Sequence, residues 1–537
     1  MSMMALMAAG CSSDDITVND GGQGNGSGLT QGTGYVALNI TLPTVSGGPS
    51  YAPGTRTVSD PTFDHGTPTE YQVNTLTISF YNNDEGTGEP IETISDYDVE
   101  DLNWSTPGSP AGGITTTALL PVHKVNFSGN AYALVEINKP NFGTANTDGS
   151  VNVTAQTLTG ALQNNFYMTN TVYNNGKALV EVTSYTTEFE AKNNAKSIHV
   201  ERAVAKVDLK TAGTDWAGTT YTAPVNTANV GDVITLNGWK LDITNKKMFP
   251  VRKFPTNIYT AGNYERFYGT QKYSTFWAVD PNYSNYDPNA SGNGKAENFN
   301  FLTATDNIDN TIGYAAYSTN EAQAAGFEYC LENTFDTKHQ KQNETTRALI
   351  KATYKPAGLT FTGTDNTWYT IGNSSKPYTK EGLQNKIKEI LGAASNVTLS
   401  ILNAGTTTIE KATFHVGTAT EATDEELDKV QKVLGTEITT YANGVCYYVV
   451  RVKHGGDSQC AWTAGEDYTQ GTMETKYLGR YGVVRNNWYR ISVKTISQPG
   501  SPTIPTAPST SDDEQNYYLQ AEINILDWAV RTQDANL

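Results

Sequence analysis

Residues 35–42 read YVALNITL, an alternation of apolar with polar or small side chains. The apolar positions that share one face are Val36, Leu38, Ile40 and Leu42. A period of two is the pattern of a β-strand with one buried face. Pro43 follows directly and ends the pattern, because proline has no N–H to donate to a neighbouring strand. The sequence therefore predicts an N-terminal strand that is folded into a sheet.

The segment that follows this strand has the opposite character. Residues 46–54 are rich in Gly, Pro and Ser, and Arg56 and Thr57 come directly after Thr55. Arg56 is the one Lys or Arg between Cys11 and Thr57, so a protease specific for basic residues has a single site there. We expect this loop to be cut readily, because exposed loops of small and polar residues are preferred sites of proteolysis.

A second alternating strand stands near the C-terminus. Residues 518–525 alternate cleanly, and an apolar pattern continues to residue 530 with a change of face. Its apolar positions are Leu519, Ala521, Ile523, Ile525, Trp528 and Val530. Residues 499–516 precede it with four prolines and then three acids, which is the composition of a stiff, solvated spacer. The sequence predicts a strong strand that a spacer holds away from the body.

Short strands separated by turn sequences fill the region between these two ends. They are expected at residues 73–81, 131–137, 178–182, 198–209, 233–236, 349–354, 444–452 and 488–496. Two amphipathic helices are expected at 380–393 and 423–434, and we interpret their apolar stripes as core packing. Thr423 and Glu426 form the capping box that opens the second helix. The pattern predicts an all-β sandwich protein with minor helices.

The charge balance limits the partners. The 537 residues include 37 Lys and Arg against 55 Asp and Glu, a formal net charge of −18. A surface this acidic argues against nucleic acid and anionic lipid, since both bind cationic surfaces. At about 150 residues per domain, the length fits two to four domains. We place one domain boundary just before residue 198.

The N-terminal residues resemble a bacterial lipoprotein signal. Residues 3–10 are apolar but far shorter than the ~20 residues that span a bilayer, and they end in small residues before Cys11. Residues 12–34 are a Gly-, Ser- and Asn-rich tether. We expect a lipid on Cys11, and the alternative is an ordinary apolar N-terminus with a chance cysteine.

Catalytic, cofactor and metal motifs do not stand out in the sequence. The six histidines are scattered outside any HExxH motif, and P-loop and GxSxG motifs are missing, so we expect neither an enzyme nor a cofactor. Residues 287–292 have the first half of a calcium loop, but Asn298 stands at its twelfth position in place of Glu. An ordinary turn is the preferred interpretation there. Whether Cys446 and Cys460, which flank a turn, form a disulfide stays open.

Two apolar strands at opposite ends of the chain need a destination, because an unpaired strand edge promotes aggregation. One destination for the C-terminal strand is its own sheet. The other is a neighbouring copy that has lost residues 35–42, whose vacated groove the strand then fills. Such a contact is head-to-tail and does not close, so it builds a filament.

These stretches together resemble the type V pilus subunits of the Bacteroidetes, closest to the major fimbrilins of the minor, Mfa-type fimbriae. The resemblance rests on Cys11, on strand 35–42 with its Arg56 loop, and on residues 200–206, 483–491 and 525–530. Residues 483–491 we interpret as sandwich core and turn. Five such features in the same order are more specific than any one of them.

The resemblance implies two tandem transthyretin-like β-sandwiches, over residues 57–197 and 198–498, with exchangeable N-terminal and C-terminal strands. Residues 1–11 would be a lipoprotein signal, and residues 12–56 would be removed on maturation. An arginine-specific protease would cut between Arg56 and Thr57, although Thr departs from the small apolar residue expected after the cut.

The resemblance also implies partners and a location. Residues 499–537 would carry the donor strand for the next identical subunit, in a filament that also holds accessory fimbrial subunits. The precursor would attach to the outer membrane by its lipid, and the mature chain would form a cell-surface fimbria that supports adhesion, colonisation and biofilm formation.

Two alternatives remain open. The first is a surface-tethered carbohydrate-binding lipoprotein, with Trp277, Tyr283 and Tyr286 as stacking platforms for sugars. The second is an accessory fimbrial subunit at the tip or the anchor. A detachable first strand and a terminal strand on a spacer argue against the first alternative. A tip protein would carry an extra adhesin domain, and an anchor should resist the cut that Arg56 invites, so the stalk subunit is preferred.

Overall fold

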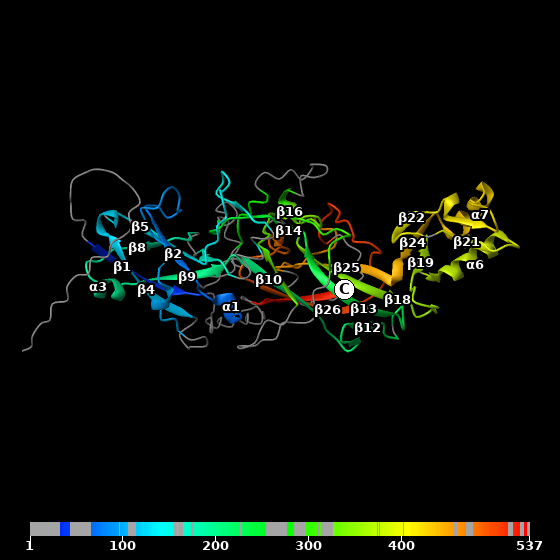
Figure 1. Ribbon diagram of the computed structural model, residues 1–537, viewed down its shortest axis with the longest axis horizontal. Helices are drawn as coiled ribbons and strands as arrows, with labels where there is room; N and C mark the ends of the chain where they lie inside the picture. Colours follow the sequence, from blue (N-terminus) through cyan, green and yellow to red (C-terminus); the bar gives the residue numbers. More distant parts are fainter. Residues whose placement is uncertain are drawn as a thin grey trace, which may run out of the picture.

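The molecule is elongated, and three lobes follow one another along its longest axis (Figure 1). The computed structural model describes residues 33–42, 66–105 except 96, 114–154 except 128, 158, 165–172, 177–253 except 226, 277–283, 297–308, 312, 326–400 except 373 and 375, 402–455, 460–468, 476–513, 519–526 and 531–533. We call residues 33–202 the first lobe, residues 204–355 with 445–533 the middle lobe, and residues 368–441 the end lobe. In the described residues, no helix is long and apolar enough to cross a membrane.

An eight-stranded sheet builds the first lobe in the order β3-β2-β5-β7-β9-β1-β4, with β8 beside β5. Its strands are β1 (Thr33–Thr41), β2 (Leu76–Tyr81), β3 (Glu92–Ile94), β4 (Thr115–His123), β5 (Ala131–Ile137), β7 (Met168–Asn170), β8 (Val180–Val182) and β9 (Lys196–Arg202). Helices α1 (Pro68–Tyr71) and α3 (Glu188–Asn193) and the 3-10 turns η1 (Val99–Asp101) and η2 (Lys124–Phe127) connect them. Strands β2 and β4, far apart in this order, share one apolar core, so the sheet curls around that core as a sandwich does.

Two five-stranded sheets face each other in the middle lobe, in the orders β17-β10-β26-β27-β28 and β11-β12-β13-β18-β25. Their strands are β10 (Val204–Thr211), β11 (Trp216–Ala217), β12 (Thr220–Thr222), β13 (Val233–Asp242), β17 (Phe327–Leu331), β18 (Arg347–Lys355), β25 (Val445–Arg451), β26 (Trp488–Ile496), β27 (Leu519–Leu526) and β28 (Arg531–Gln533). Side chains of both sheets, such as Val207 and Ile491 from one and Ile234 and Ile350 from the other, fill a common core. The prediction of an all-β fold with minor helices is confirmed.

The single strand predicted over residues 198–209 is wrong, because it is two strands. Ile198 of β9 pairs with Ile40 in the first lobe, whereas Val207 of β10 pairs with Tyr489 in the middle lobe. Ala203 lies between them, where the apolar alternation shifts from even to odd positions. The domain boundary before residue 198 and the limits of the two sandwiches stay predictions.

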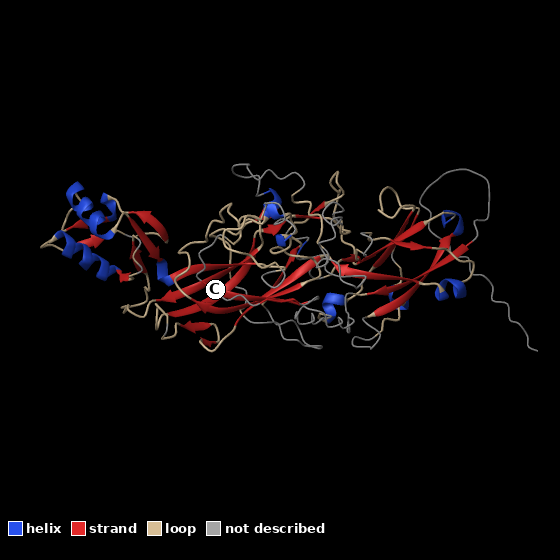
Figure 2. Cartoon of the chain, turned by 180° about the vertical axis from the view of Figure 1, so that it is seen from behind, coloured by secondary structure: helices blue, strands red, loops and turns tan. Residues whose placement is uncertain are grey.

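The end lobe is inserted between β18 and β25, which are neighbours in their sheet. It holds β19 (Trp368–Ile371), β20 (Tyr378–Thr379), α6 (Lys380–Leu391), β21 (Val397–Leu399), β22 (Gly405–Thr408), η6 (Lys411–Thr413), β23 (Phe414–Val416), α7 (Asp424–Leu434) and β24 (Glu437–Tyr441), and η7 (Ala442–Gly444) follows. Both predicted helices and the Thr423–Glu426 capping box are confirmed. They pack into a core of this lobe's own, and they lie at one end of the molecule (Figure 2).

Buried ion pairs and one short β-pairing join the first and middle lobes. Strand β15 (Lys247–Met248) pairs with β6 (Val151–Asn152). The short strands β14 (Thr244–Asn245) and β16 (Phe299–Asn300) pair with each other, and the turn η5 (Thr337–His339) precedes β18 in the chain. Glu70 of α1 lies 2.7 Å from the ammonium of Lys206, and both side chains are at most 1% exposed. Burial alone would raise the pKa of Glu70, but Lys206 and Arg202 lower it below its usual value. The carboxylate of Glu70 therefore stays ionised between the lobes.

The block at residues 483–491 is core and turn, as predicted. Val483 and Val484 are fully buried, and Asn486 turns the chain with a positive φ of 59°. Arg485, also fully buried, forms an ion pair with Glu332. This charged pair inside the block is an addition that the sequence did not predict.

Candidate functional site

Strand β1 lies between two other strands of its sheet. It runs antiparallel to β4 and parallel to β9, so that Leu38 stands opposite Ala118 on one side and Lys196 on the other. We call the space that it occupies the β1 slot. This position means that β1 uses both edges of its backbone for hydrogen bonds.

Hydrogen bonds also hold both ends of β1. The N–H of Tyr35 donates to the carbonyl of Tyr185 at 2.9 Å, and the N–H of Tyr185 returns a bond of 2.8 Å. At the other end, the N–H of Leu42 donates to the carbonyl of Ile114 at 2.9 Å. The strand is thus an integral part of the first lobe in this structure.

The four apolar residues predicted from the alternation all point into the core. Val36, Leu38, Ile40 and Leu42 are at most 2% exposed. Burying four such side chains contributes on the order of 10 kcal/mol before the entropy cost of ordering the strand. The predicted buried face of residues 35–42 is confirmed.

Removal of β1 would leave a site with defined binding chemistry. The facing edges of β4 and β9 would each present unpaired backbone groups, and the floor between them would be apolar. An extended peptide with an apolar side chain at every second residue satisfies both requirements. The β1 slot is therefore a potential strand-binding groove.

Strand β27 pairs with its own sheet in this structure. It runs antiparallel to β26, with Leu519 opposite Ile496, Ile523 opposite Ile491 and Ile525 opposite Tyr489. On its other side lies β28, the last strand in that order, which the sequence analysis did not predict. Of the two destinations considered for the C-terminal strand, this structure has the intramolecular one.

Several of the predicted site residues lie outside the described residues. These are Cys11, Arg56, Thr57, Trp528 and Val530, together with Tyr286 and the calcium-like residues 287–292. The structure gives the backbone pairing of four other predicted residues, Leu519, Ala521, Ile523 and Ile525. Their roles in lipidation, cleavage and strand donation stay predictions.

The prediction of a solvated spacer is wrong for Gly500, Asp512 and Asp513, which are buried, whereas Thr503, Thr506 and residues 508–510 are exposed. The side chains of Asp512 and Asp513 are buried, 0% and 7% exposed, and each pairs with an arginine. Arg451 lies 61 residues from Asp512 in sequence, and Arg480 lies 33 residues from Asp513. The composition of residues 499–513 alone could therefore not reveal these ion pairs. A useful signal was present, because both arginines stand in apolar stretches where a cation needs a buried partner.

The stacking platform of the carbohydrate-binding alternative is contradicted at Trp277. Its side chain is 1% exposed, and its indole N–H donates to the carbonyl of Phe335 at 3.1 Å. The hydroxyl of Tyr283 donates to Asn333 at 2.8 Å inside the same cluster. Trp277 therefore serves packing in the middle lobe, and the partly buried ring of Tyr283 lies against Phe299 and Phe335.

The three described cysteines are Cys330, Cys446 and Cys460, and all are buried free thiols. The disulfide between Cys446 and Cys460 that the sequence left open is therefore not formed in this structure. Within the described part of the chain, no cluster of His, Cys, Asp and Glu side chains could hold a metal ion.

Comparison with protein families gives one match. Residues 439–534 match the family described as major fimbrial subunit protein type IV, Fimbrillin, C-terminal. The match includes β25, β26, β27 and β28. It confirms, for this part of the chain, the resemblance to Bacteroidetes fimbrial subunits. No curated protein matches the chain.

Several solved structures resemble the chain weakly over most of its length. A protein of Parabacteroides distasonis described as a cell adhesion protein is 12% identical, covers 94% of this chain and 98% of its own, and has a TM-score of 0.37. A fimbrilin (fimA) of Porphyromonas gingivalis W83 is 15% identical, covers 94% of this chain and 99% of its own, and has a TM-score of 0.32. The C-terminally truncated tip fimbrial protein Mfa3 of Porphyromonas gingivalis is 12% identical, covers 92% of this chain and 100% of its own, and has a TM-score of 0.31. We draw no conclusion on function from TM-scores below 0.5.

Proposed function

We propose that this chain is a structural stalk subunit of a cell-surface fimbria that polymerises by strand exchange. The observation that carries the proposal is the position of β1, a buried strand between β4 and β9 that precedes the loop of Arg56. The family match over residues 439–534 supports a fimbrial subunit. The chain's part in the filament would be structural.

Cleavage after Arg56 is the proposed trigger. The chain precedes the cut as a lipoprotein held at the outer membrane by Cys11, and an arginine-specific protease separates residues 1–56 from the body. Strand β1 then has no covalent link to the rest of the first lobe. Its release is slow or needs a competing strand, because it leaves two hydrogen-bonded neighbours and an apolar core.

The C-terminal strand of another copy is the proposed replacement. Leu519, Ala521, Ile523 and Ile525 have the spacing of Val36, Leu38, Ile40 and Leu42, with three polar or small residues between them in each case. An incoming strand with this spacing can place apolar side chains at every inward position of the β1 slot. Main-chain bonds to β4 and β9 supply affinity, and the apolar positions supply register.

A filament follows from the geometry of such an exchange. Each subunit offers a donor strand from its middle lobe and a groove in its first lobe, so the contact is head-to-tail and repeats without closing. The partners are identical subunits along the stalk, with accessory fimbrial subunits at its ends. Adhesion, colonisation and biofilm formation are the roles that such a fimbria supports.

The test treats the purified full-length chain with an arginine-specific protease, locates the cut by mass spectrometry and follows filaments by negative-stain electron microscopy. Arg56→Lys is the matched control, because it keeps the charge and removes the cleavage site. We expect filaments from the cleaved wild type, and none from Arg56→Lys or from a chain truncated after Asn516. Filaments from either variant, or a cleaved wild type that stays monomeric, would contradict the proposal.

A further inference from the structure

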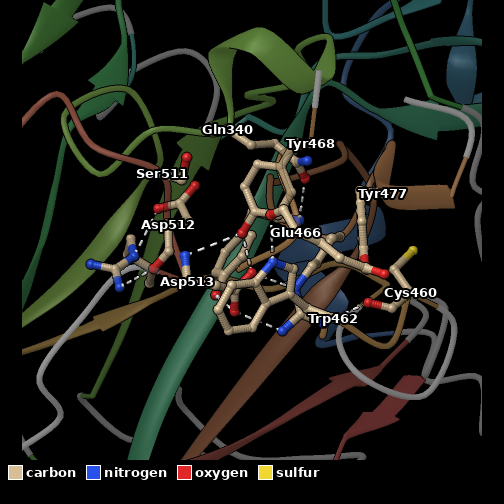
Figure 3. Close-up of polar contacts among 12 residues, drawn as sticks. Gln340, Cys460, Trp462, Glu466, Tyr468, Tyr477, Ser511, Asp512 and Asp513 are labelled. Carbon is tan, nitrogen blue, oxygen red and sulfur yellow. Dashed lines mark hydrogen bonds and ion pairs between the residues drawn. The ribbon is translucent and has the colours of Figure 1, made fainter. Parts of the chain in front are cut away.

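Asp512 and Asp513 fix the chain to the middle lobe six residues before β27 begins. Both oxygens of Asp513 accept from the guanidinium of Arg480, each at 2.7 Å. The hydroxyl of Tyr481 donates to the same carboxylate at 2.9 Å, and the hydroxyl of Tyr468 donates to it as well. Figure 3 shows Asp513 and Tyr468 within this cluster. A bidentate arginine pair with two further donors is a strong and directional contact.

Asp512 makes a second, different contact beside it, and burial raises the pKa of this carboxyl to about 7. One carboxylate oxygen lies 2.7 Å from Nε of Arg451, and the other accepts from the hydroxyl of Thr345 at 2.6 Å. The backbone takes part too, since Arg451 also donates to the carbonyl of Asp512 at 2.7 Å. Adjacent acids therefore engage two different arginines from β25 and from the segment before β26.

Backbone contacts continue this attachment upstream. Ser501 and Tyr447 exchange two bonds of 2.7 and 2.9 Å, and Arg347 donates to the carbonyl of Pro505 at 2.7 Å. The N–H of Gln342 donates to the carbonyl of Thr510 at 3.0 Å. The connection from β26 to β27 is thus part of the middle lobe up to Asp513.

Charge and burial make the contact between Asp513 and Arg480 costly to break. Burial opposes ionisation of Asp513, but Arg480 and Tyr468 hold its pKa below the usual value. Arg480 is 3% exposed and also donates to the carbonyl of Cys460 at 2.6 Å. If Asp513 left its site, Arg480 would remain as a buried cation without its carboxylate, which is strongly unfavourable.

The strand that follows is held differently. In the described residues β27 is bonded to the body through β26 alone, because its other neighbour, β28, belongs to the same terminal segment. Peeling the two strands from β26 breaks one ladder of backbone hydrogen bonds. The attachment at Asp513 is expected to outlast the pairing of β27.

We propose that the contacts of Asp512 and Asp513 form a lock that keeps residues 499–513 on the middle lobe while β27 exchanges partners. The part of this inference that concerns exchange rests on the function proposed above. The lock limits the reach of the donor strand, because six residues from Asp513 to Leu519 span at most about 20 Å. Without it, the nearest upstream contacts are those of Gln342 with Thr510 and Ser511, and the nine residues from Thr510 to Leu519 would span about 30 Å. The lock thus sets the spacing and stiffness of the subunit contact.

The first test is hydrogen–deuterium exchange on the uncleaved full-length monomer, which does not depend on filament formation. We expect the amides of Asp512 and Asp513, which donate to the carbonyl of Gln340 and to the hydroxyl of Tyr468, to exchange at least tenfold more slowly than the amides of residues 519–526. Asp513→Asn should raise exchange at 510–513 at least tenfold and leave β13 and β18 unchanged. The control Glu425→Gln removes an exposed ion pair with Lys429 and should change neither region. Equal exchange of the two segments in the wild type would overturn the lock.

The double variant Asp513→Asn/Arg480→Gln addresses the case in which Asp513→Asn unfolds. It removes both charges together, so it should fold while still losing protection at residues 510–513. Unchanged protection in a folded double variant would overturn the lock.

The second test uses a matched pair of insertions and the filament itself. Four Gly and Ser residues inserted between Glu514 and Gln515 lie after the lock, and the same insertion between Thr506 and Ala507 lies before it. We expect the first insertion to change the axial repeat or the assembly rate and the second to change neither. Equal effects would overturn the lock, whereas a cleaved wild type without filaments contradicts the proposed function and leaves the monomer result standing.

Discussion

The N-terminal strand β1 and the C-terminal strand β27 have the same sequence pattern but occupy different positions. Strand β1 has a neighbour from the body on each side, whereas β27 has one such neighbour, β26. A strand with two neighbours is costly to remove and leaves a groove, and a strand with one neighbour is easier to release. The difference supports the proposed roles, in which the first strand would define the acceptor site and the last strand would move.

The largest effect is expected from a charged substitution in the buried face of β1. Leu38→Asp places a carboxylate among fully buried apolar side chains, and we expect a loss above about 5 kcal/mol in the free energy of unfolding. Asn39→Asp is the adjacent control, because Asn39 accepts a bond from Thr117 that an aspartate keeps. Urea denaturation of the uncleaved chain measures both. Similar stabilities of the two variants would show that β1 is not part of the core.

The next effect concerns the chain just after the proposed cut. Glu70→Gln leaves Lys206 buried without its carboxylate, and we expect a loss of about 3–5 kcal/mol. The exposed ion-pair variant Glu425→Gln should cost less than about 1 kcal/mol. Urea denaturation of the two variants measures both losses of stability. Equal losses would mean that Glu70 does not stabilise the part of the chain that remains after β1 departs.

A pH effect should arise from three buried carboxyls, Glu201 of β9 and Asp280 and Asp512 of the middle lobe, because burial raises the pKa of each to about 7. Burial raises the pKa of Asp280 to about 7, and Asp280 lies on neither β1 nor β4. Its native carboxyl therefore keeps a proton that the unfolded chain loses above its ordinary pKa of about 4. Stability from this group is full at low pH and falls as pH rises toward 7, by on the order of 2 kcal/mol between pH 5 and 7.

Thermal or urea unfolding at pH 5, 6 and 7 measures this slope. Asp280→Asn cannot titrate, so it should make the slope smaller whatever its effect on overall stability, and Glu201 and Asp512 should account for the slope that remains. A variant with the wild-type slope would assign the pH dependence to other groups.

The smallest effect concerns the end lobe, which contributes no strand to either site. Thr423→Ala removes the side-chain cap of α7, whose hydroxyl accepts from the N–H of Glu426, and should cost about 1 kcal/mol. We expect cleavage and filament growth at the wild-type rate. A slower assembly of this variant, seen by light scattering, would bring the end lobe into the subunit contact.

Sequence patterns predicted what depends on neighbours along the chain. The alternation of residues 35–42 gave the buried face of β1, and Thr423 with Glu426 gave the start of α7. The alternation could not say which strands flank β1, because pairing with β4 and β9 depends on residues about 80 and 160 positions away. Topology and not propensity made β1 an interior strand.

The errors have the same physical cause. The composition of the proline-rich residues 499–513 predicts a solvated spacer. In the structure, Arg451 and Arg480 pair with the buried acids Asp512 and Asp513 of this segment. Trp277 reads as an exposed aromatic in a loop-rich region until Phe335 and the rest of the middle lobe cover it. In both cases a distant segment decides burial, and the composition of the segment itself does not predict it.

The central claim is that the strand in the β1 slot is replaced by the C-terminal strand of another copy. A cryo-electron microscopy map of the cleaved, assembled protein tests it directly, because side chains identify the strand between β4 and β9. The account predicts residues 519–530 of a neighbouring subunit in that position. Residues 33–42 still lying between β4 and β9 in the filament would contradict it.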